Sequence, residues 1–109
     1  MASVFSLSDV RVVERPKLLY KMFGEKEMEF CVLLLEVAED GAQGRAAKFY
    51  RVPVECWGQV ARRAVELAAN EVLRGVSGVI RSRRWVGKKY QVEHYDVVLK
   101  ATSLNVFEN

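Results

Sequence analysis

The hydrophobic period of the chain changes from that of a strand to that of a helix at Trp57-Gly58, and this change constrains the fold more than any other feature. From about Ser3 up to this point, the apolar residues alternate or run continuously, as they do in strands. In residues 60–68 they follow the spacing of one helical face. The strand pattern returns at Val72. The sequence therefore predicts three strands, one helix and two further strands.

The expected boundaries follow from breaks in this pattern. The strands cover Ser3 to Val13, Met28 to Val37, Ala47 to Cys56, Val72 to Trp85 and Tyr90 to Ala101, and the helix covers Gly58 to Asn70. Leu18 to Tyr20 continues the first strand beyond Pro16, and Leu104 to Phe107 extends the last. Ala38 to Arg45 is a loop. Gly75 and Gly78 predict bulges or a bend, which closure of a barrel requires.

This order of elements predicts a mainly β fold, the oligonucleotide-binding (OB) fold. That fold is a five-stranded, partly open Greek-key barrel, and here its one helix lies between the third and fourth strands. A split ferredoxin-like sheet would need a second helix, for which the pattern leaves no room. We expect residues 1–109 to form a single domain, either a whole protein or a part of a longer one.

The second strand is apolar on both of its faces from Phe30 to Leu35. A half-exposed strand alternates apolar and polar residues, so we expect both faces to be covered, by the domain itself or by a partner. The partner is either a second copy of the chain or another OB-fold protein that pairs through a strand edge. The expected interface consists of Phe30, Val32, Leu33, Leu34 and Leu35.

The reactive residue types are few and scattered. Cys31 and Cys56 lie in apolar strand patterns, which is typical of buried reduced thiols. His94, the only histidine, lies in an alternating strand, where a packed or hydrogen-bonded role is the common one. The sequence contains no nucleophile–base pair, metal-ligand cluster or glycine-rich phosphate loop. We therefore expect no enzyme, no metal and no cofactor.

Two segments resemble the signature regions of the bacterial and mitochondrial single-stranded DNA-binding (SSB) family. Val52 to Ala61, with the sequence VPVECWGQVA, resembles the third strand of that family and the start of its helix. Arg81 to Trp85, with the sequence RSRRW, resembles the end of its fourth strand, and Tyr90 to Glu93 the start of its fifth. The resemblance covers nearly the whole chain. It implies a non-catalytic barrel that binds single-stranded RNA or DNA.

The resemblance also assigns candidate binding residues. Trp57 and Trp85 fill positions at which the family stacks bases, and Arg51 stands where it often carries another aromatic; a guanidinium also stacks on a base. Residues two apart in a strand share a face, so Arg81, Arg83 and Trp85 point the same way. The predicted set is Arg51, Trp57, Arg81, Arg83, Arg84, Trp85, Lys88 and Lys89. The alternative for the two tryptophans is that they pack in the core. The alternative for the charged residues around Trp85 is that they form a solvated hairpin tip.

The chain also departs from the family. Its loop from Val86 to Lys89 is shorter than the long hairpin of the family, and the acidic C-terminal tail is absent. These departures indicate a specialised relative, compatible with the SSB-like subunits of the kinetoplastid mitochondrial RNA-editing complex. We accordingly expect the protein to be located in the mitochondrial matrix, or otherwise in the bacterial cytoplasm. The sequence shows no targeting segment and no apolar run long enough for a membrane span.

Two functions from different classes stay open at this point. In the first, the protein holds a single strand of nucleic acid in a basic groove, in keeping with a formal charge of +3. Its affinity would then fall steeply with salt. In the second, the barrel is mainly a scaffold that assembles with itself or with other OB folds and binds little nucleic acid.

Overall fold

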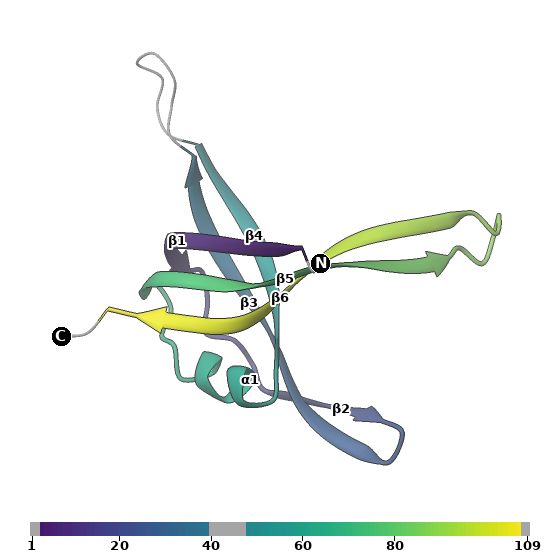
Figure 1. Ribbon diagram of the computed structural model, residues 1–109, viewed down its shortest axis with the longest axis horizontal. Coiled ribbons are helices and arrows are strands. Elements are labelled where there is room, and N and C mark those ends of the chain that lie inside the picture. Colours follow the sequence, from purple (N-terminus) through teal and green to yellow (C-terminus); the bar gives the residue numbers. More distant parts are fainter. Residues whose placement is uncertain (1–2, 40–47, 108–109) are drawn as a thin grey trace.

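The computed structural model describes residues 3–39 and 48–107. Its elements are β1 (Val4–Val12), β2 (Leu19–Phe23), β3 (Lys26–Glu39), β4 (Lys48–Trp57), α1 (Gln59–Ala64), β5 (Val72–Val86) and β6 (Glu93–Val106). Figure 1 shows the strands wound around one another with α1 at one end. Of the loop expected at Ala38 to Arg45, Ala38 and Glu39 belong to β3. The rest of this loop and the expected start of the third strand at Ala47 lie outside the described residues.

The strands close into a barrel. β1 pairs antiparallel with β3 and with β5, β3 pairs with β4, and β5 pairs with β6. The ring is completed by a parallel contact of β4 with β6 over only two pairs, Val54 with Leu99 and Glu55 with Lys100. Pro53, which has no N–H to donate, directly precedes this contact. The barrel is therefore partly open there, and the predicted OB fold is confirmed.

A sixth strand, β2, replaces the expected continuation of the first strand. β2 forms a hairpin with the first part of β3, from the pair Leu19–Phe30 to the pair Phe23–Lys26. The two-residue turn starts with Gly24 at a φ of 61°, a conformation that glycine adopts without strain. β3 therefore begins at Lys26, and the hairpin extends beyond the barrel (Figure 1).

The glycines of β5 lie at the predicted irregularities. The register between β5 and β6 shifts between Leu73 and Gly75 and again between Ser77 and Gly78. A Cβ atom on Gly78 would lie 1.9 Å from the carbonyl oxygen of Lys100, which no side chain tolerates. On Gly75 the nearest atoms would be 3.7 Å away. Gly78 therefore lets the two strands approach closely where the barrel bends.

Beyond the barrel, β5 and β6 continue as a two-stranded arm, in which residues 80–86 pair with residues 93–99. Figure 1 shows this β5–β6 arm projecting away from the barrel. The predicted short turn at Val86 to Lys89 was wrong, because Val86 still pairs with Glu93 and the turn spans residues 87–92. Gln91 has a φ of 52°, which ends the strand pattern that the sequence suggested from Tyr90.

The core fills the barrel from every strand except β2. Its fully or nearly fully buried residues include Val10, Val12, Cys31, Leu33, Leu35, Val54, Cys56, Leu73, Val76, Ala101 and Leu104. Ala61 and Ala64 of α1, together with Leu67, close one end. Both cysteines are free and buried, as predicted.

The helix is shorter than predicted. It ends at Ala64, and the chain then returns through turns to β1, where the amide of Asn70 donates to the carbonyl of Val12 at 2.7 Å. Asn70 has the left-handed conformation expected of a helix stop, with a φ of 70°. In the part of the chain that the structure describes, no helix has the length and apolar character needed to cross a membrane.

Candidate functional site

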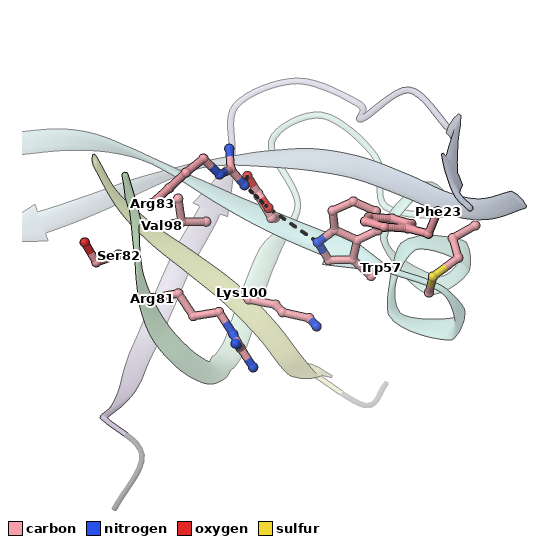
Figure 2. A pocket seen from close by; sticks show the side chains of 9 residues that line it. Phe23, Trp57, Arg81, Ser82, Arg83, Val98 and Lys100 are labelled. Atoms are coloured by element: carbon pink, nitrogen blue, oxygen red, sulfur yellow. Dashed lines mark hydrogen bonds and ion pairs between the residues drawn. The ribbon is translucent and has the colours of Figure 1, made fainter. Parts of the chain in front are cut away.

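A groove of about 460 Å³ lies where the β2–β3 hairpin, the end of β4 and the base of the β5–β6 arm meet (Figure 2). One wall, which we call the aromatic wall, consists of Phe23, Met28 and Trp57. The opposite wall, which we call the cationic wall, consists of Arg81, Ser82, Arg83, Val98 and Lys100, and Glu55 completes the lining. The groove thus offers an apolar surface and a row of positive charges that face the same space.

The aromatic wall is built around Trp57. Its ring centroid lies 5.1 Å from that of Phe23, edge to face, and 4.4 Å from that of Phe30. The ammonium group of Lys21 lies 4.1 Å above the ring of Phe30, within the range of a cation–π contact. Trp57 is half-buried, so it packs on the barrel and also lines the groove. The indole is held in place and keeps part of its surface for a ligand.

The cationic wall is set by the pairing of β5 with β6. Arg81 and Arg83 are two residues apart and so share a face of β5. Lys100 pairs with Val79, two residues before Arg81, and therefore lies on the same face. Among the described residues, no carboxylate lies within ion-pair distance of Arg81 or Lys100. Both charges are therefore available to an anionic ligand.

Glu55 links the two walls. Its carboxylate accepts hydrogen bonds from Arg83 at 3.1 and 3.3 Å and from the indole N–H of Trp57 at 3.4 Å. Figure 2 shows these contacts as dashed lines, which run from the carboxylate to the guanidinium of Arg83 and to the indole of Trp57. The side chain of Glu55 is 18% exposed. The carboxylate thus orients one group on each wall.

The other predicted residues of the arm lie outside the groove. Trp85 lies on the same face as Arg83 but further out, where its ring stacks on His94 at 4.1 Å and its indole N–H donates to Asp96 at 2.9 Å. Arg84 points to the opposite face and pairs with Glu93. Lys88 and Lys89 lie in the exposed turn at the tip of the arm.

Arg51 lies on β4, on the face that carries Glu55 and Trp57. It is exposed and about 20 Å from Trp57 along the strand, given the rise per residue of a strand. Phe49, on the same face and 64% exposed, is a further aromatic that the sequence analysis did not single out. Arg51 is therefore outside the groove, at a distance that only a ligand several nucleotides long would span.

The predicted partner interface on β3 needs correction. Leu33 and Leu35 are fully buried in the core of the single chain, and Phe30 is 4% exposed under Trp57. These three residues are not available to a partner. The interior of the barrel covers one face of the strand, and the aromatic wall covers Phe30 on the other. Only Val32, 45% exposed, and the half-buried Leu34 retain surface for an interface.

The remaining reactive groups suggest no further chemistry. A hydrogen bond with Cys31, together with burial, raises the pKa of Cys56 far above its usual value, which keeps this thiol protonated. In residues 3–39 and 48–107, no three His, Cys, Asp or Glu side chains are grouped in a way that could hold a metal ion.

No protein-family model and no curated protein matches the chain. Solved structures do match it. The SSB domain of a Synechococcus sp. protein is 19% identical, with a TM-score of 0.64 and 96% of each chain covered. The protein priB from Ralstonia solanacearum is 16% identical, with a TM-score of 0.66, and 98% of this chain and 100% of that one are covered.

A third solved structure is the small single-stranded DNA-binding protein from Streptomyces coelicolor. It is 14% identical, with a TM-score of 0.60, and 98% of this chain and 95% of that one are covered. Likenesses at these identities establish the fold, so the chain has an SSB-like OB fold.

Proposed function

We propose that the protein is a non-catalytic module that binds single-stranded nucleic acid, and DNA in the first place. The observation that carries this proposal is the groove, in which Trp57, Arg81 and Arg83 come together. A base would stack on the aromatic wall while its phosphates lie against the cationic wall, which is how sequence-tolerant single-strand binders work. The likeness to a single-stranded DNA-binding protein from Streptomyces coelicolor supports DNA as the ligand.

The β5–β6 arm would lengthen the binding track. Trp85 lies on the groove face of the arm, where its ring stacks on His94 and the residue is still 45% exposed, so it retains surface for a base. Lys88 and Lys89 continue the positive charge to the tip. Phe49 and Arg51 extend the track in the other direction along β4. We expect the groove to provide most of the affinity and these outlying residues to add to it.

Fluorescence anisotropy with labelled DNA and RNA strands of equal length tests the proposal. We expect the protein to bind the single strands and to prefer them to a duplex of the same length. Trp57→Leu should weaken binding by about 1–3 kcal/mol, roughly 5- to 150-fold, because it removes one stacking surface. Tyr20→Leu is the matched control, since Tyr20 is an exposed aromatic outside the groove.

Equal affinity of wild type and Trp57→Leu would show that the strand does not use this wall. No binding at low salt would contradict the proposal as a whole. The ratio of RNA to DNA affinity decides between an RNA and a DNA ligand. The RNA-editing complex and the locations in the mitochondrial matrix or the bacterial cytoplasm stay predictions.

A second candidate function is assembly, and a different surface favours it. On the face of the β5–β6 arm that points away from the groove, Ile80, Tyr95 and Val97 are 38%, 64% and 75% exposed. The ion pair of Arg84 with Glu93 lies on the same face. Exposed apolar side chains of this kind on an extended arm are typical of an interface. We propose that the arm pairs with the arm of a second copy and thereby leaves the groove free. The alternative, a scaffold for other OB folds that binds little nucleic acid, would use the same face.

Light scattering across a range of concentrations tests the assembly. We expect the wild type to be a dimer or larger, and Val97→Glu to weaken the association at least tenfold, because it buries a charge in the apolar contact. Val72→Glu is the control, because it introduces the same negative charge at a residue that is 46% exposed and lies outside the arm. A wild type that stays monomeric at high concentration would rule out self-assembly.

A further inference from the structure

Glu55 is the one acidic residue among the nine that line the groove. A carboxylate is unexpected there if the groove serves a polyanion alone, since like charges repel a phosphate and raise the cost of binding. Its side chain is 18% exposed, so the charge is not simply a solvated surface group. The position of Glu55 therefore calls for a ligand group that donates hydrogen bonds.

The carboxylate retains capacity to accept them. Two oxygens offer about four acceptor positions. Three of these are in use, because Arg83 contacts both oxygens through one nitrogen and the indole N–H of Trp57 makes a third contact. The indole contact is long, at 3.4 Å, and a ligand that replaced it would find one acceptor position on each oxygen. This last contact also places the carboxylate at the edge of the indole ring. A base stacked on the aromatic wall would thus present its own edge to Glu55.

The four bases differ in what that edge donates. Guanine presents two adjacent donors on its Watson–Crick edge, N1–H and the N2 amino group, which match the two oxygens of a carboxylate. Cytosine and adenine present one amino group beside an acceptor nitrogen, and thymine and uracil present one N–H between two carbonyls. In a single strand this edge is free to be read.

The geometry points to Glu55 as a residue that selects guanine, so that the groove is a guanine-preferring subsite for single-stranded nucleic acid. This inference rests on the proposed function and names its base preference. Arg83 is the positioning residue, because its ion pair at 3.1 Å fixes the carboxylate and offsets its charge. Arg81 and Lys100 then hold the phosphates on either side.

The test uses labelled oligo-dT strands with one central substitution by dG, dA, dC or inosine. A single guanine per strand prevents four-stranded structures. We expect the dG strand to bind at least about fivefold more tightly than all-dT, the lower end of what a bidentate pair discriminates. Inosine lacks the N2 amino group and should fall between the two.

Glu55→Gln should bring the dG-to-dT ratio to within about twofold, even though loss of the negative charge tightens binding to every strand. Glu27→Gln is the matched control: it removes the same charge at an exposed residue of β3 that does not line the groove, and it should keep the preference. A preference for dG that survives in Glu55→Gln would overturn the assignment.

The wild-type ratios alone keep the inference falsifiable if Glu55→Gln does not fold. Equal affinity of the wild type for all five strands would overturn the guanine subsite and leave the proposed function intact. Absence of binding to every strand would instead contradict the proposed function itself.

Discussion

Gly78→Ala should destabilise the protein by about 3 kcal/mol or more, and lower its melting temperature by roughly 10–20 °C. The added Cβ atom would lie 1.9 Å from the carbonyl oxygen of Lys100 and 2.8 Å from the Cα atom of Ala101. Both are backbone atoms, so no side-chain rotation relieves the clash, and the paired strands have to separate. Such a loss is a large share of the 5–15 kcal/mol that stabilises a typical domain.

Gly75→Ala provides the matched control, three residues earlier on the same strand. Its Cβ atom would meet only ordinary contacts at 3.7 Å, so we expect a change within about 1 kcal/mol, or a slight gain from the less flexible unfolded chain. Urea denaturation followed by circular dichroism measures both variants. Similar midpoints for Gly78→Ala and Gly75→Ala would show that the two strands do not meet as closely as described.

The triple variant Arg81→Gln, Arg83→Gln and Lys100→Gln should lose roughly a hundredfold in affinity for single-stranded DNA at about 50 mM salt. Each lysine or arginine that neutralises a phosphate contributes about −0.7 to the slope of log affinity against log salt for a single strand. Arg81 and Lys100 are the two charges available to phosphates, whereas Arg83 is paired with Glu55 at 3.1 Å. The triple variant should therefore make the slope less negative by about 1.4. Anisotropy titrations at four or more salt concentrations give both quantities.

The control is a second triple variant, Arg15→Gln, Lys17→Gln and Arg74→Gln. These residues are exposed and lie outside the groove. Each triple variant removes three positive charges, so the formal net charge falls from +3 to 0 in both. If the binding depended on net charge alone, the two variants would lose affinity equally. We expect the control to keep most of the affinity and nearly the whole salt slope.

Local patterns predicted the parts of this structure that depend on local geometry. The change of period at Trp57-Gly58 gave the order of the elements, and the glycines of β5 marked the register shifts at Gly75 and Gly78. The two-residue period of a strand placed Arg81 and Arg83 on one face, and the structure places both in the groove. Trp57 followed from the family resemblance and lies opposite them.

The rest of the site depends on contacts between distant segments. Lys100 lies beside Glu55 only because β4 and β6 make a short parallel contact, for which neither strand carries a local signal. Phe23 contacts Trp57 because β2 forms a hairpin with β3, whereas the sequence suggested only that Leu18 to Tyr20 continue the first strand. The apolar run from Phe30 to Leu35 suggested a partner, because the sequence does not show that Trp57 of another strand covers Phe30.

The parallel contact between β4 and β6 has a mechanical consequence. With two residue pairs it is as short as the contact between β1 and β3, and the barrel should open first at one of these two seams when the chain fluctuates. The second of these pairs, Glu55 with Lys100, also lines the groove. A single strand of nucleic acid bound across the groove would hold β4 and β6 together at this contact. Occupancy of the groove and closure of the barrel are then linked equilibria, each of which stabilises the other.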